Sequence, residues 1–457
     1  MMWWIVVVSL VALFLAVSLK KGPQMGMATV VPIAWLFPAW LMIYLVQHQA
    51  SIVGKGIDVK VAVGTTCLIL YCFLPGRTFP VRLVASDFAM LGLFFTHILS
   101  DISHDGFNWE ILGRAYVEWY LPYVAGRVAF QSQDALKKSW RVIAFVGLAL
   151  AIISIIEAAT EVNLLETAFD VRPEEGLARD KTRWGFHRAY GPTLNPIYFG
   201  VVQVLLLGWT LHGAVRAVHR RASSAWIIAL IISIIGVIGT GSRGPLVGVV
   251  ATVYFGAFYF LPKSRAWLIG LAAICLVVGV VFKEPIISTL ERRSGEDRRQ
   301  KEFTVDGETR KHSSIRARFA LFEVNKFALK HSGLLGFGTT AVSGFPVNVP
   351  VGQVDAEALK RVWTIENTYA LVTLRFGYLG VSFLIIAGAL VLWQFFKVSE
   401  DHFGSSTQWI CGSLGATTAA VLLIQNTVWM PHEIGFPLLW TFGLSAGLSY
   451  ANRKGDL

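Results

Sequence analysis

The chain has 457 residues, of which 54% are hydrophobic and 15% are charged, and its mean hydropathy is +0.57. Soluble domains are about 25% charged, whereas this chain gathers its apolar residues into blocks of roughly 20, the length that crosses a bilayer. This composition excludes a soluble globular enzyme, a disordered chain, a coiled coil and a collagen, and it lacks the alternating strands of an outer-membrane barrel. We therefore predict an all-α, polytopic integral membrane protein that forms a single membrane domain over residues 1–457.

The net charge of +11 reflects topological bias in such a protein, so no nucleic-acid partner is expected. The cysteines lie in apolar segments without CxxC or Cys/His spacing, which is typical of buried small hydrophobes. No metal, cofactor or disulfide framework is predicted.

Apolar runs predict about twelve or thirteen transmembrane helices. The first run has no cleavage pattern behind it and is interpreted as a retained span. The predicted spans are residues 3–19, 27–47, 58–75, 82–100, 113–131, 140–160, 196–215, 224–240, 245–262, 265–283, 368–396, 406–429 and 434–451.

Basic residues follow every second span, from Lys20 and Lys21 to Arg453 and Lys454. The positive-inside rule assigns these connections to the cytoplasm. The opposite side receives two long outer loops, residues 161–195 and 284–367.

Two arginines are predicted at the outer membrane boundary. Arg243 stands between glycines in the short connection 240–245, and Arg188 follows His187 just before a span. The planar guanidinium matches phosphate oxygens, so both arginines are candidate anion ligands, and His187 is a weaker candidate. The alternatives are a snorkelling arginine in a tight turn and a solvated basic turn.

The large outer loop contains apolar residues at helical spacing over 314–331, with Arg316 and Arg318 in the first turns. This pattern predicts an amphipathic helix, which Gly333 ends just after His331. The mixed-charge run before it is interpreted as solvated.

Glu366, Asn367 and Tyr369 stand where the large outer loop enters a late span. Glu366 is either a general base or an acid that favours the start of a helix. Other polar groups are predicted inside spans, with Glu118 and Arg127 interpreted as a structural pair; the remaining two are Glu157 and Gln425.

Three segments in chain order resemble the O-antigen ligase and O-antigen polymerase family. They are Ser242-Arg243-Gly244, His331 to Gly338, and Glu366-Asn367 followed by Gly377 and Gly380. They are similar to the motifs "SRG", "hPllGxG" and "HN-x-yL-x-x-x-x-x-G-x-x-G" of that family. Arg188-Ala189-Tyr190-Gly191 resembles its upstream "R-x-x-G" loop, and the resemblance covers about residues 185–395. The family has His where this chain has Glu366, a departure that favours a polymerase over a ligase.

The resemblance implies metal-independent glycan transfer on the outer face of the bacterial inner membrane, from an undecaprenyl-diphosphate-linked donor to a sugar hydroxyl. The acceptor is another lipid-linked repeat in a polymerase and lipid A-core in a ligase. Membrane lipid and other polysaccharide assembly proteins are further expected partners. The implied catalytic residues are Glu366, Arg243 and Arg188, and the implied substrate-binding residues are Asn367, Arg316, Arg318, His331, His187 and Tyr369. A transporter of a lipid-linked anion is the competing class, although no internal repeat supports it.

Overall fold

A computed structural model describes residues 2–38, 42–43, 57–76, 82–169, 182–183, 185–219, 221–282, 285, 288, 301–305, 308–312, 328–342 and 365–455. Among these residues the protein is a helical bundle in which the strands form only three two-stranded antiparallel pairs. The predicted all-α polytopic membrane fold is confirmed.

Among the described residues, six helices meet the length and hydropathy expected of a membrane span. They are α7 (Gln133–Thr160), α9 (Pro196–Val218), α11 (Arg243–Phe260), α17 (Thr368–Asp401), α18 (Ser406–Ile424) and α19 (His432–Lys454).

The structure contains further helices and helical turns. They are α1 (Met2–Lys21), α2 (Pro23–Ile33), η1 (Ala34–Leu36), α3 (Val59–Phe73), α4 (Ala85–Asp105), α5 (Trp109–Ala115), the π-helical turn η2 (Tyr116–Tyr120), α6 (Leu121–Ala129), α8 (Leu164–Phe169), α10 (Ala225–Gly239), η3 (Pro262–Ser264), α12 (Arg265–Val281) and α15 (Gly338–Val342).

The strand pairs are β1 (Met42–Ile43) with β2 (Ile57–Asp58), β3 (Thr182–Arg183) with β4 (Phe186–His187), and β5 (Lys301–Val305) with β6 (Glu308–His312).

One predicted span is wrong. Residues 27–47 do not form a single helix, because α2 ends at Ile33 and the short η1 ends at Leu36. Pro32 lies inside α2 and Pro38 follows η1. A proline lacks an amide donor and restricts the residue before it, so two prolines this close end a helix. Every other predicted span overlaps a helix.

The core of the bundle is α18 and α19, which are almost entirely buried. α19 packs against α6, and α18 packs against α9 and α11. Where α6 and α19 cross, glycines let the backbone of one helix approach the backbone of the other. A Cβ on Gly443 would lie 1.9 Å from the Tyr123 carbonyl oxygen, and one on Gly126 would lie 2.0 Å from that of Trp440. Small residues permit this close approach of helices in a membrane.

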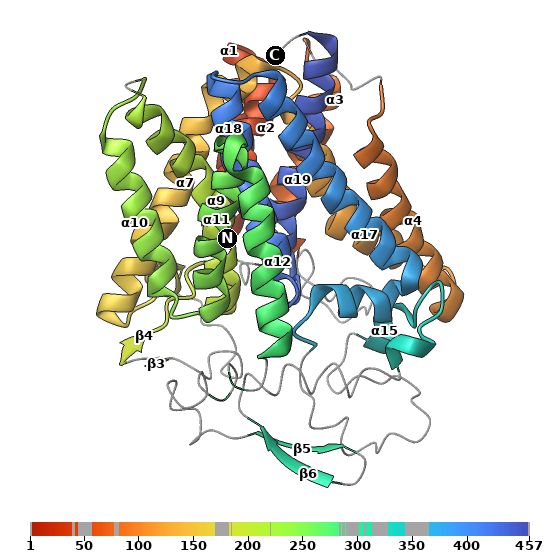
Figure 1. Ribbon diagram of the computed structural model, residues 1–457. Helices are drawn as coiled ribbons and strands as arrows, with labels where there is room; N and C mark the ends of the chain where they lie inside the picture. The colour runs from red at the N-terminus through yellow and green to blue at the C-terminus, as the bar shows by residue number, and fades with distance from the viewer. Residues whose placement is uncertain are drawn as a thin grey trace.

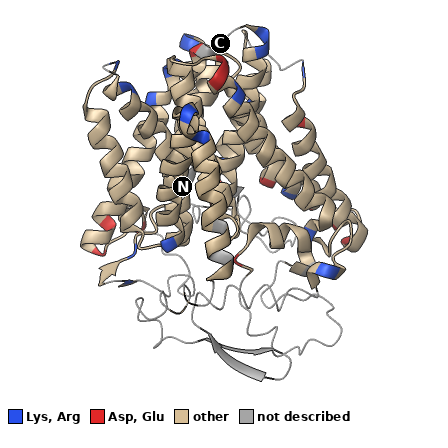
Figure 2. Ribbon diagram, viewed as in Figure 1, with Lys and Arg blue, Asp and Glu red and all other residues tan. Residues whose placement is uncertain are grey.

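The described outer-loop elements lie at one end of the bundle. β3, β4 and α15 occupy the end of the bundle opposite the C-terminus, which we call the outer end (Figure 1). Lys and Arg residues gather at the end that carries the C-terminus (Figure 2).

Candidate functional site

The hairpin β3–β4 rests on the turn that joins α10 to α11. The Arg188 guanidinium donates from Nε to the Thr240 carbonyl oxygen at 3.3 Å and from Nη2 to the Ser242 hydroxyl at 3.0 Å. Arg183 donates to the Gly241 carbonyl oxygen at 3.4 Å. Gly241 has a φ of +57°. The loop that carries Arg188 therefore lies directly on the turn that precedes Arg243, and we call this contact the arginine junction.

Glu157 fixes the segment that follows Arg188. Its carboxylate accepts hydrogen bonds from the backbone amides of Tyr190 at 3.1 Å and Gly191 at 2.9 Å, and from the Asn163 side chain at 3.2 Å. The Tyr190 hydroxyl donates to Glu166 at 2.5 Å, and burial raises the pKa of Tyr190. The intramembrane acid Glu157 thus ties α7 to the arginine junction.

The turn 333–338 packs into a kink of α17. Gly377 has a φ of +66° inside α17, and Gly336 in the turn has a φ of +73°. A Cβ on Gly336 would lie 2.5 Å from the Arg375 carbonyl, and one on Gly377 would lie 2.2 Å from the Leu334 carbonyl oxygen. Only glycine fits both the conformation and the space at these positions.

Backbone hydrogen bonds hold this contact, which we call the glycine junction. The Phe337 amide donates to the Leu374 carbonyl oxygen at 2.7 Å. The amides of Tyr378 and Leu379 donate to the carbonyl oxygens of residues 333 and 334 at 3.0 and 3.2 Å. The part of α17 before the kink lies across the outer end, and the part after it crosses the bundle (Figure 1).

A buried network joins the glycine junction to α4 and η2. Asp101 accepts from the Thr339 amide at 2.7 Å and lies 3.2 Å from His97 Nε2. The Trp119 indole N–H donates to His97 Nδ1 at 2.9 Å. Because Nδ1 accepts, Nε2 carries the proton that points to Asp101. His97 also stacks on Phe376, with ring centroids 4.3 Å apart.

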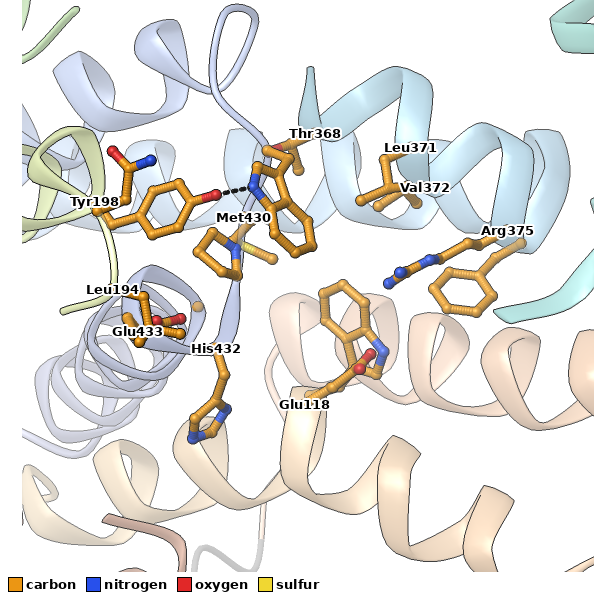
Figure 3. Close-up of a pocket in the computed structure, with 16 residues that line it drawn as sticks. Glu118, Leu194, Tyr198, Thr368, Leu371, Val372, Arg375, Met430, His432 and Glu433 are labelled. Atoms are coloured by element: carbon orange, nitrogen blue, oxygen red, sulfur yellow. Dashed lines mark hydrogen bonds between the residues drawn. The ribbon is translucent and has the colours of Figure 1, made fainter. Parts of the chain in front are cut away.

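A cavity of about 400 Å³ opens between η2, the start of α9, the start of α17 and the connection from α18 to α19. Figure 3 shows its lining, with Arg375 directed from α17 toward Glu118. Glu118 belongs to the π-helical turn, a local structure that is frequent at functional sites. The lining is Glu118, Trp119, Leu194, Asn195, Tyr198, Thr368, Leu371, Val372, Arg375, Phe376, Trp429, Met430, Pro431, His432, Glu433 and Gly435.

The connection between α18 and α19 brings the predicted segments together. Asn367 caps α17 by accepting from the Ala370 amide at 2.8 Å, and its amide donates to the Asn426 carbonyl at 2.7 Å. The Thr368 hydroxyl bonds to the Gln425 side chain and to the Val428 carbonyl, the latter at 2.9 Å. A Cβ on Gly244, next to Arg243, would be in contact with side chains of residues 424, 427 and 428.

The structure places the predicted site residues in different surroundings. Glu366 and Arg243 are half-buried, His187 is buried in β4, and His331 is exposed. The Tyr369 hydroxyl donates to the Leu422 carbonyl at 2.9 Å. None of these residues lines the cavity, although Glu366 and Asn367 directly precede its lining residue Thr368.

Part of the large outer loop lies outside the described residues. Arg316 and Arg318 belong to that part, as does most of the predicted amphipathic helix 314–331. Its last residues, 328–331, are helical.

The predicted pair of Glu118 with Arg127 is wrong. Arg127 Nε donates to Asp87 at 3.3 Å, while Glu118 lies 3.7 Å from His97 and lines the cavity. Asp87 lies within a predicted span, 40 positions before Arg127, and only the packing of α4 against α6 brings the two side chains together.

Arg375, His432 and Glu433 were missed as cavity residues. A lone arginine in an apolar span indicates a functional site by itself. The sequence around Arg375 therefore carries such a signal. His432 and Glu433 line the cavity only because α19 packs against other helices. No local sequence pattern indicates that packing. Within the described residues, no group of three or more His, Cys, Asp or Glu side chains is placed to hold a metal ion.

The comparisons with known proteins bear on the segment that carries these features. No curated protein is significantly similar to the chain. The sequence profile of the O-antigen ligase family matches residues 228–385. That segment contains the turn before Arg243, the glycine junction and the Glu366-Asn367 segment. The resemblance found in the motifs is therefore confirmed, and residues 228–385 of this polytopic membrane protein match the O-antigen ligase family.

Proposed function

We propose that the protein is a polysaccharide polymerase that transfers an undecaprenyl-diphosphate-linked glycan to a sugar hydroxyl of another lipid-linked repeat. The observation that carries this proposal is the meeting of the family-matched segments at one end of the bundle. The segment of Arg243 and the segment of Glu366 both contact the turn at 424–428, and a cavity opens beside that turn.

In the proposed reaction the acceptor hydroxyl attacks the anomeric carbon of the donor, and the lipid diphosphate leaves. Arg243 and Arg188 bind the diphosphate, because charge-assisted bonds from guanidinium groups stabilise the negative charge that builds on the leaving group. Glu366 takes the proton of the acceptor hydroxyl. This assignment requires no metal ion.

The roles of the other predicted residues are more limited in this proposal. Asn367 and Tyr369 shape the mouth of the site, Asn367 through its bond to the connection between α18 and α19 and Tyr369 through its bond to the last turn of α18. His187 and His331 are proposed substrate contacts from the two outer loops, and Arg316 and Arg318 are proposed contacts from the amphipathic helix.

A ligase is the second candidate, and the matched family is described as O-antigen ligase. It would use the same lipid-linked donor and transfer the glycan to lipid A-core. A deletion strain separates the two. Single repeats left on the carrier lipid, with long chains lost, would support a polymerase. Full-length chains accumulating on the carrier lipid would support a ligase, and unaltered glycans would contradict both.

We also propose that the protein resides in the bacterial inner membrane with its outer end facing the periplasm. The basic connections support this orientation. Phe186→Cys at the outer end and Ser223→Cys between α9 and α10 form a matched pair, since both positions are exposed. An impermeant thiol reagent applied to intact spheroplasts should label the cysteine at 186 and spare that at 223. The reverse pattern would invert the topology.

A further inference from the structure

The Arg375 guanidinium faces the cavity and makes no hydrogen bond or ion pair within the described part of the chain. Its Nε is buried and has no hydrogen-bond partner. The backbone around it is fixed, because the Ser100 hydroxyl donates to the Arg375 carbonyl at 2.7 Å and the glycine junction follows at once. Arg375 as a whole is half-buried, and a buried N–H group without an acceptor is costly unless a ligand supplies one.

The neighbouring acids interact with Arg375 only at longer range. Glu118 and Asp101 act on it electrostatically, as does the like charge of Arg114. Asp101 is occupied by His97 and Thr339. Glu118 is the other neighbouring acid. Its side chain is 31% exposed, and its carboxylate lies 3.7 Å from His97 Nδ1. Arg375 and Glu118 thus face the cavity as opposite charges that do not form an ion pair.

The rest of the lining suits a sugar. Trp119, Tyr198, Phe376 and Trp429 supply aromatic surface, and the volume of about 400 Å³ falls within the range of about 300–1,000 Å³ typical of small-molecule sites. A diphosphate would bring two or more negative charges next to Glu118 and Glu433, and like charges this close are repelled. A single carboxylate beside Arg375 carries one negative charge and is repelled less.

We propose that this cavity binds a glycosyl unit that bears a carboxylate, such as a uronic acid, with Arg375 as the residue that recognises the acid. Arg375 offers two parallel N–H donors that match a carboxylate, and the aromatic rings cover the apolar faces of the sugar ring. This inference rests on the proposed glycan-transfer function and adds a preference for acidic sugars to it.

The test uses the full-length protein in lipid nanodiscs and compares the binding of methyl glucuronide with that of methyl glucoside by saturation-transfer NMR. A charge-assisted hydrogen bond typically contributes enough for about a tenfold or greater preference. We expect the wild type to prefer the glucuronide by about that factor and Arg375→Gln to bind both sugars equally. Arg375→Lys should keep part of the preference.

Two further variants separate recognition from a merely structural effect. Glu118→Gln removes the like charge and should strengthen glucuronide binding while leaving glucoside binding unchanged. Arg114→Gln removes a cation that lies outside the cavity lining, 3.8 Å from Asp101, and should keep the preference. Thermal stability measured for each variant identifies those that fail to fold.

Equal binding of the two sugars to the wild type, or a preference that persists in Arg375→Gln, would overturn the proposal. Inorganic pyrophosphate that displaces the glucuronide at lower concentration than glucuronic acid does would assign Arg375 to the diphosphate instead. The deletion phenotype is independent of these measurements. Lost chains without a glucuronide preference refute only this inference, and unaltered glycans with that preference intact refute only the glycan-transfer proposal.

Discussion

The two junctions at the outer end hold their turns by different means. At the arginine junction, side chains fix the turn. Arg188 and Arg183 donate hydrogen bonds to the carbonyl oxygens of residues 240 and 241 and to the Ser242 hydroxyl. At the glycine junction the bonds run from backbone to backbone, and glycines let the chains touch. The difference shows in the arginines, because Arg188 also holds the turn that positions Arg243, whereas the Arg375 guanidinium is directed into a cavity (Figure 3).

The largest effect is expected at the arginine junction. Arg243→Ala should abolish turnover, and Arg243→Lys should leave a small fraction, because lysine lacks the two-pronged guanidinium that matches phosphate. Arg188→Ala should also lose turnover. Glycan transfer by the reconstituted protein, with binding of the lipid-linked donor, measures both.

Arg265→Gln is the matched control, because this arginine is bonded to Glu400 at 2.6 Å at the end opposite the junctions. It should keep turnover in the folded protein. Normal turnover in a folded Arg243→Ala variant would move the diphosphate contact away from the arginine junction.

Glu366 stands just before α17, and its replacement distinguishes a base from a helix-start acid. General-base catalysis contributes about 100- to 10,000-fold, so Glu366→Gln should reduce turnover by that order while donor affinity persists. Glu366→His should retain some activity. Loss of only a helix-dipole contribution would cost about 0.3–1 kcal/mol in stability and leave turnover intact. Near-normal turnover in Glu366→Gln would assign the base elsewhere, with His187 and His331 the next candidates.

The glycine junction is tested by two alanine substitutions in one turn. Gly333 and Gly336 have φ values of +61° and +73°, so each alanine should cost about 1–2 kcal/mol of backbone strain. A Cβ at 333 meets nothing within 4 Å, whereas one at 336 lies 2.5 Å from the Arg375 carbonyl. We expect Gly336→Ala to lose about 1–3 kcal/mol more than Gly333→Ala through overpacking. Equal shifts of the thermal transition would show that the turn does not pack into the kink.

The smallest effect is expected at the cap of α17. Asn367→Ala removes the acceptor for the Ala370 amide and should cost about 1 kcal/mol. Asn367→Asp keeps that acceptor but loses the donor to the Asn426 carbonyl, so its thermal stability should lie between those of alanine and the wild type. If both variants unfold like the wild type, the cap does not stabilise α17, and a loss of turnover in them would point to a direct role in binding.

Most of the spans followed from the sequence because the thickness of a bilayer imposes a local length and composition on each helix. The failure at 27–47 has an equally local cause in Pro32 and Pro38, which a hydropathy average does not register. The contact between the segments of Arg188 and Arg243 was suggested by their predicted depth in the membrane, although the bonds that form it were not.

The sequence by itself determined which residues are candidates, because the motifs around Arg243, Gly336 and Glu366 are contiguous and stand at predicted helix ends. Only the tertiary structure decided how their side chains are used. Arg127 pairs with Asp87 instead of Glu118, and Arg375 reaches a cavity built by four separated segments. Those outcomes depend on which helix faces meet. A hydrogen bond or a cavity between residues hundreds of positions apart is a property of that packing and leaves no periodic trace along the chain.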